Sequence, residues 1–181
     1  MKKYNFLIFF FLLFFCCVPI NVWAEDDDIE SDIGKNVKLG SITVSVRSIS
    51  FYKEKNHLMV ERLEQLYENV PQNFYAVDLL IFNTSKDNYE YNPYQFVFID
   101  DDDNEYQWCI STKEPKFEGK ILKPGMMGKG YLVFAVPKTV KPTHVVFDPG
   151  YLYDGRVKFA IKNISVDTPT DKKSDEKRKD N

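Results

Sequence analysis

The chain has 181 residues, of which 44% are hydrophobic and 15% aromatic, and its formal net charge is −3 at neutral pH. This length suits one domain that can bury a core without disulfides or metals. The slight acidic excess argues against general binding to nucleic acids or to anionic lipids, which both need clustered Lys and Arg.

The first 24 residues have the three parts of a secretory signal peptide. Lys2 and Lys3 form a positive end, an unbroken apolar stretch runs from Phe6 to Val18, and the segment ends in the small residue Ala24. The apolar stretch of about 13 residues is shorter than the roughly 20 that span a bilayer. We therefore predict export, with cleavage after Ala24.

Two alternatives to cleavage remain open. A lipoprotein would be lipidated at Cys16 or Cys17, although the preceding residues, Phe15 and Cys16, are not the small residues that such processing prefers. An uncleaved membrane anchor is the second alternative.

After cleavage Cys109 would be the only cysteine, so no intrachain disulfide can form. We expect it to be a buried, apolar-like side chain, and pairing with a partner or catalysis are the other possibilities.

Both ends of the remaining chain have the composition of disordered segments. The stretch EDDDIESD, residues 25–32, contains six acids and a single apolar residue. The tail DTPTDKKSDEKRKDN, from Asp167, contains no apolar side chain. Neither can bury enough surface to offset its ordering entropy. We predict a disordered leader at residues 25–35, one domain at 36–166 and a disordered tail at 167–181.

Seven segments within this domain have the period-two hydrophobicity or the continuous apolar character of β-strands. Ile42, Val44 and Val46, for example, alternate with polar residues. The strands are predicted at residues 41–49, 74–83, 94–100, 105–111, 130–137, 143–148 and 156–166. Because strands and helices do not alternate, the pattern predicts an all-β, immunoglobulin-like antiparallel sandwich and not a parallel sheet.

One segment between the first two strands has helical spacing instead. Met59, Leu63, Leu66 and Val70 follow one another at intervals typical of one helix face, and Pro71 ends the pattern. A helix this short needs something to dock on. The apolar stripe packs either on an edge or end of the sandwich or in the groove of a partner. Met59, Leu63 and Leu66 are therefore candidate partner-binding residues.

Tyrosines concentrate in the connection NYEYNPYQF, which begins at Asn88. Tyr89, Tyr91 and Tyr94 surround Pro93, and tyrosine is favoured at recognition surfaces because it offers a large rigid ring with a polar tip. These three residues are the second set of candidate partner-binding residues. The alternative is that their rings cover the end of the sandwich and that their hydroxyls are satisfied locally.

Two groups of residues suggest metal sites, but neither has the spacing of one. The acidic run from Asp100 to Glu105 lacks the alternating oxygens and central Gly of a calcium loop, so we predict a solvated hairpin link. A copper-type site would have to gather His144, Cys109 and a methionine of the Met126-Met127 pair by folding alone. We expect no resident cofactor or metal.

The stretch KPGMMGKGYLVFAVP, residues 123–137, combines glycines with a lysine as phosphate loops do. A phosphate loop needs a helix behind it and a Ser or Thr after the lysine, whereas Lys129 is followed by Gly130 and then by a β-rich run. Pro124-Gly125 is instead a good pair for a type II turn. The stretch therefore predicts a turn that leads into a strand.

Several of these segments, taken in order, resemble a known family. They are ITVSV from Ile42, YAVDLLIFNTS from Tyr75, YNPYQFVFIDDDDNEY from Tyr91 and LKPGMMGKGYLVFAVPKTVKPTHVVFDPG from Leu122. Their order is similar to that of bacterial exported domains of unknown function described as telokin-like or immunoprotective extracellular immunoglobulin-like. The resemblance covers roughly residues 40–161. It implies a sandwich at a bacterial surface or in the secreted fraction and brings no catalytic residues.

The chain departs from that family at two places. Asp103-Asn104 stands where the family often has Asp-Gly, and the helical insert, residues 57–70, is longer than the usual first connection. We predict an exported, non-catalytic module that binds a protein or has a structural role in the envelope. The alternative is a carrier of a small molecule or a metal, which needs a concave pocket with converging polar groups. An enzyme would need a cleft with titratable groups of displaced pKa.

Overall fold

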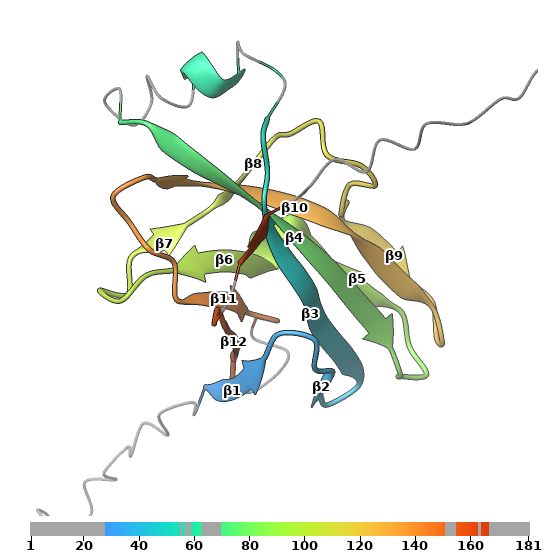
Figure 1. Cartoon of the computed structure of the whole chain (residues 1–181). Coiled ribbons are helices and arrows are strands. Elements are labelled where there is room, and N and C mark those ends of the chain that lie inside the picture. Colours follow the sequence, from blue (N-terminus) through green and yellow to red (C-terminus); the bar gives the residue numbers. More distant parts are fainter. Residues whose placement is uncertain are drawn as a thin grey trace, which may run out of the picture.

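The computed structural model describes residues 28–54, 56, 59–62, 70–150, 155–162 and 164–166. The predicted signal peptide and charged tail lie outside them. Two β-sheets pack face to face, which confirms the all-β sandwich (Figure 1). The strands are β1 (Ile29–Asp32), β2 (Val37–Leu39), β3 (Ile42–Phe51), β4 (Gln72–Asn83), β5 (Tyr89–Tyr91), β6 (Phe96–Ile99), β7 (Glu105–Tyr106), β8 (Trp108–Cys109), β9 (Lys120–Leu122), β10 (Met127–Pro137), β11 (His144–Phe147), β12 (Val157–Ala160) and β13 (Ser165–Val166).

The first sheet has the order β1-β12-β11-β6-β7, and the second has the order β13-β3-β4-β10-β8, with β2 also paired to β3. A separate ribbon is formed by β5 and β9. Strand pairs in the described part of the chain are antiparallel except β1 with β12 and β13 with β3. No helix in these residues is both long and apolar enough to cross a membrane.

The main core lies between the two sheets. Alternate residues of β4 and β10 point into it, and the ring of Phe134 on β10 stacks on that of Phe98 on β6 with centroids 4.3 Å apart. The opposite faces of the same two strands form a second, smaller apolar cluster that includes Phe74 and Val133. Because β4 is apolar on both faces and pairs on both sides, its prediction as a central strand is confirmed.

The glycine-rich stretch forms a turn and a strand, as predicted. The Met126 N–H donates to the Lys123 carbonyl at 3.0 Å, and Gly125 has φ of 74°, as position i+2 of a type II turn requires. The chain continues as β10. An added Cβ at Gly130 would lie 2.6 Å from the Lys116 carbonyl carbon, so this glycine lets a neighbouring segment cross close to β10.

Two of the seven predicted strands are each divided between the two sheets. Residues 105–111 contain β7 of the first sheet and β8 of the second, with Gln107 between them. Residues 156–166 contain β12 and β13, which also belong to different sheets. Alternation continues through such a crossing, so the sequence does not reveal it. These divisions and several strands of two to four residues bring the described strands to thirteen.

The prediction of a disordered leader is wrong from residue 28 onward, because β1 lies in this stretch. Asp28 accepts hydrogen bonds from Arg156 Nε at 3.1 Å and forms an ion pair with Lys158 at 2.8 Å, and Asp32 pairs with Lys162. These cations neutralise Asp28 and Asp32. They come from the other end of the chain, so local composition could not show them.

The helical insert is described only in part. Residues 59–62 form a helical turn in which Met59 is half-buried, whereas Leu63 and Leu66 lie outside the described residues (Figure 1, top). The neighbouring Val60 packs on the smaller apolar cluster, on the outer face of the second sheet. The role predicted for the Met59, Leu63 and Leu66 stripe stays a prediction.

Candidate functional site

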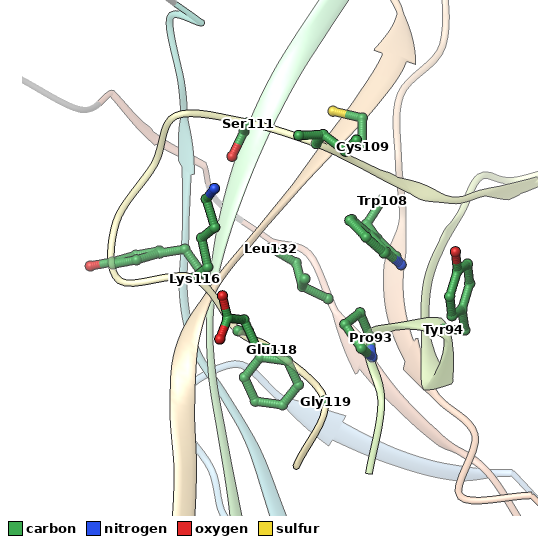
Figure 2. Close-up of a pocket in the computed structure, with 12 residues that line it drawn as sticks. Pro93, Tyr94, Trp108, Cys109, Ser111, Lys116, Glu118, Gly119 and Leu132 are labelled. Atoms are coloured by element: carbon green, nitrogen blue, oxygen red, sulfur yellow. The ribbon is translucent and has the colours of Figure 1, made fainter.

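A pocket of about 420 Å³ opens on the side of the sandwich. Its walls come from the 3-10 turn η2 (Pro93–Gln95), from β8 and the two residues after it, from residues 116–119 and from β10. Figure 2 shows Trp108 and Tyr94 on one side, Lys116 and Glu118 on the other, and Leu132 between them. We call this site the flank pocket.

The flank pocket exists because one side of β10 is only partly covered. After the chain crosses between the sheets at Gln107, β8 pairs with β10 at only two positions, Trp108 with Phe134 and Cys109 with Val133. The chain returns to β10 at Tyr131, whose N–H donates to the Pro115 carbonyl at 2.8 Å. The pocket lies beside this short paired stretch, and its apolar lining is continuous with the main core.

The turn η2 holds Tyr94 in place at the rim. The Asn92 side chain accepts from the Tyr94 N–H at 2.9 Å, and the Gln95 side chain accepts from the Asn92 N–H at 3.0 Å, which is a capping box. Tyr94 is 72% exposed. It lies against Trp108 with ring centroids 5.5 Å apart and planes tilted by 60°.

The structure separates the three predicted tyrosines. Tyr89 and Tyr91 are 5% and 2% exposed, and Tyr91 packs on Phe117 with centroids 4.9 Å apart. Their rings therefore cannot form a contact surface, and that part of the prediction is wrong. They cover the interior, as the alternative interpretation held. Tyr94 alone of the three lies at the surface beside the flank pocket.

A buried carboxylate fixes the other rim of the pocket. Glu54 is 6% exposed, and its oxygens accept from the Thr112 N–H at 3.0 Å and the Thr112 hydroxyl at 2.9 Å. It also accepts from the Asn56 N–H at 3.0 Å. These bonds attach residues 110–112 to the start of the insert. Ile110, which is 68% exposed, is thereby held at the mouth of the pocket.

The charged side chains at the site are mostly engaged. The Lys113 ammonium lies 4.8 Å from the ring centroid of Tyr131, and Lys116 forms an ion pair with Glu114 at 3.8 Å. Burial, followed by the charge of Glu54, raises the pKa of the Cys109 thiol to about 12. The thiol is therefore protonated at neutral pH and is a weak nucleophile and metal ligand.

Comparisons with known proteins place this chain in a family. The model of a family described as a domain of unknown function, DUF4352, matches residues 31–174. The chain belongs to this family. No curated protein matches it.

Solved structures with the same fold include a secreted protein and a putative lipoprotein. The secreted protein MPT63 of Mycobacterium tuberculosis is 13% identical with a TM-score of 0.55, and the match covers 74% of this chain and 98% of that one. A putative lipoprotein, ycdA, of Bacillus subtilis is 16% identical with a TM-score of 0.56, over 74% of this chain and 40% of that one. The yjhA protein of Bacillus subtilis is 17% identical with a TM-score of 0.52, and the match covers 72% of this chain and 98% of that one. At these identities the likeness shows the fold.

The acidic run from Asp100 forms the hairpin link that was predicted. Asp100 is buried and accepts from the N–H groups of Asp102 and Asn104 at 3.0 and 2.9 Å and from the Tyr106 hydroxyl at 2.8 Å. These bonds, with that of the Asn104 side chain foremost, lower the pKa of Asp100 to about 2. Its oxygens are thus directed at the loop itself, between the antiparallel strands β6 and β7.

The structure does not bring the copper-type ligands together. On β10 Met127 lies six residues from Val133, the partner of Cys109, which corresponds to about 20 Å along a strand. His144 lies on the other sheet, 3.6 Å from a carboxylate oxygen of Glu30. Within the described residues no three His, Cys, Asp or Glu side chains are grouped to hold a metal ion.

Sequence reasoning missed Trp108 and Glu54, which shape the flank pocket. Trp108 lay inside a run predicted as one regular strand, and Glu54 lay in a polar connection. Neither carries a local signal, because the pocket results from the crossing at Gln107 and from contacts 58 residues apart.

Proposed function

We propose that this DUF4352 chain is an exported, non-catalytic recognition module that binds a protein partner at the flank pocket. The observation that carries the proposal is a preformed, mostly apolar pocket with a tryptophan in its wall and exposed Tyr94 and Ile110 at its mouth. Binding hot spots are enriched in Trp and Tyr, and large exposed apolar side chains beside a pocket mark interaction sites.

The chemistry of the pocket supports a non-catalytic role. Among the described residues its lining contains no histidine, and its cysteine is protonated because burial raises the thiol pKa. The charged residues of the described lining, Lys116 and Glu118, are exposed at the rim, so neither is desolvated in the way that raises the pKa of the Cys109 thiol. General acid–base or nucleophilic catalysis needs an acid, base or nucleophile whose pKa is tuned to the reaction.

Export is supported by the signal-peptide features of residues 1–24 and by the secreted and lipoprotein-like structural neighbours. Cleavage after Ala24 gives a free module, and lipidation at Cys16 or Cys17 would give a tethered one. The narrower relationship to telokin-like, immunoprotective extracellular domains belongs to the same proposal.

Site-specific photo-cross-linking in the native host tests the proposal. A benzophenone amino acid replaces Ile110 at the mouth of the pocket, and the control replaces Lys38 on β2, at the opposite end of the second sheet. We expect a discrete protein adduct from position 110 and none from position 38. No adduct at position 110, or equal adducts at both positions, contradicts a partner site at the pocket.

The same pocket supports the alternative function, a carrier of a small apolar molecule. Its volume lies within the range of about 300–1,000 Å³ that is typical of small-molecule sites. A carrier would yield no protein adduct, and native mass spectrometry would show an added mass that is lost in Leu132→Trp, which fills the pocket floor. The copper-type version lacks support because its ligands lie apart.

A further inference from the structure

The wall of the flank pocket contains a polar atom with an unused hydrogen-bonding capacity. The indole Nε1 of Trp108 is buried and has no hydrogen-bond partner among the described residues. Buried donors in folded proteins almost always have an acceptor, and a missing one indicates an acceptor supplied by water or by a ligand. Figure 2 shows this nitrogen on the edge of Trp108 that is turned toward Tyr94.

Tyr94 is suited to act as the cover of this donor. Its backbone is fixed by the Asn92 cap, but the residue is 72% exposed and its ring contacts Trp108 only in a tilted arrangement. Rotation about the side-chain bonds of an exposed tyrosine is fast and costs little, because few contacts are lost. A rotated Tyr94 would leave the indole N–H open to an acceptor oxygen at the mouth of the pocket.

The lining narrows the class of ligand. Four of the described lining residues are aromatic, namely Tyr94, Trp108, Phe117 and Tyr131. Aromatic groups pack favourably on one another in tilted and edge-to-face arrangements. A sugar carries hydroxyls around its whole ring, for which the few polar side chains here are insufficient. A cationic ligand is disfavoured because the Lys113 ammonium already lies on the Tyr131 ring.

We propose that the flank pocket takes an aromatic side chain of an extended peptide segment, and that the Trp108 indole N–H donates to a carbonyl oxygen of that segment when Tyr94 rotates away. The inference rests on the proposed function and names its partner chemistry. The 420 Å³ volume accommodates one such side chain with its flanking amide groups. The opposite charges of Lys116 and Glu118 at the rim suit a neutral backbone, with its paired N–H and C=O dipoles.

The test uses the NMR signal of the indole N–H. The chain has two tryptophans, Trp23 and Trp108, so protein from residue 25 onward has a single indole signal, that of Trp108. The probes are N-acetyl-phenylalanine methylamide, its alanine counterpart and the disaccharide of N-acetylglucosamine. We expect the phenylalanine amide to move the indole signal downfield with saturation and a dissociation constant on the order of a millimolar. The other two probes should leave the signal unchanged.

Two variants divide the proposal into its parts. Trp108→Phe keeps an aromatic ring but removes the donor, so the phenylalanine amide should bind about five- to tenfold more weakly. Tyr94→Ala should accelerate hydrogen exchange of the indole N–H at least about tenfold, and Ile121→Ala, at an exposed position of β9, should not. If Trp108→Phe does not fold, the wild-type indole shift decides the question alone.

Each other result overturns the inference. If Trp108→Phe and the wild type bind the phenylalanine amide with equal affinity, the indole N–H does not donate to the ligand. If the disaccharide shifts the indole signal, the pocket is a saccharide site. If the phenylalanine amide does not bind, the pocket does not take an aromatic side chain. A protein adduct at position 110 together with these negative results leaves the proposed function in place and rejects only the ligand class.

Discussion

The two sheets end in short edge strands that are held in different ways. None of the four residues of β1 is buried. Ion pairs hold its two ends: Arg156 and Lys158 pair with Asp28, the residue before β1, and Lys162 pairs with Asp32. At the edge of the second sheet, β8 is half-buried and packs on both apolar clusters. The chain beyond it is fixed by the buried Glu54.

The difference indicates where a recognition site can be built. Exposed ion pairs contribute little to stability and weaken in salt, so an edge that they hold is easily loosened. Packing together with a satisfied buried carboxylate keeps side chains in one position, as a preorganised binding site requires. The flank pocket lies beside the second kind of edge.

The largest expected effect is the loss of the Glu54 carboxylate. Glu54→Ala removes a buried acceptor of hydrogen bonds from Thr112 and Asn56 and should lower the free energy of unfolding by about 2 kcal/mol. Urea unfolding measures this, with Glu90→Ala at an exposed position of β5 as the control. A loss as small as that of the control would contradict the role given to Glu54.

A smaller and more local effect is expected at β1. Arg156→Ala removes a partner of Asp28 and should lower the local opening free energy by about 1 kcal/mol, with little change in global unfolding. Hydrogen exchange of the Ile29 N–H, which donates to the Arg156 carbonyl at 2.8 Å, reports this opening. If Arg156→Ala lowers the free energy of global unfolding as much as Glu54→Ala does, the two edges are equivalent.

Acid should also separate the two edges. Partial burial opposes ionisation of Asp28, but hydrogen bonds from Arg156 and Lys158 outweigh it and lower its pKa below the usual 3.8. The contribution of Asp28 is therefore complete above about pH 4 and is lost as the pH falls through its lowered pKa. Ile29 exchange, corrected for its intrinsic pH dependence, should show β1 opening only below about pH 4. If β1 begins to open near pH 6, a titratable group other than Asp28 holds the strand.

The smallest effect is expected from calcium at the acidic hairpin. Because the Asp100 oxygens already accept hydrogen bonds from their own loop, millimolar calcium should leave the melting temperature unchanged. Thermal unfolding with and without chelator is the measurement. A rise of several degrees would establish a calcium site there.

The sequence predicted those parts of the fold that depend on side-chain period. The alternation from Ile42 and the two-sided apolar run of β4 gave strands in the right places, because burial on a sheet face imposes a period of two wherever the strand lies. Pro124-Gly125 likewise carried its turn in its own chemistry. In each case the signal is local.

The candidate site was less predictable because its parts meet only in the folded chain. Tyr94 comes from η2 and Trp108 from a strand that begins just after a crossing between sheets. The ion pair of Asp28 with Arg156 spans 128 positions, so the acidic leader looked unfoldable when read alone. Tyr89 and Tyr91 showed the opposite problem, since their polar neighbourhood concealed two core residues.

Cross-linking in intact cells decides whether the β8 edge of the second sheet carries the recognition site. We expect a discrete protein adduct when the photoreactive group stands at Ile110 and no adduct when it stands at Lys38. Adducts that are absent at position 110, or that do not differ between the two positions, would contradict a recognition site at this edge.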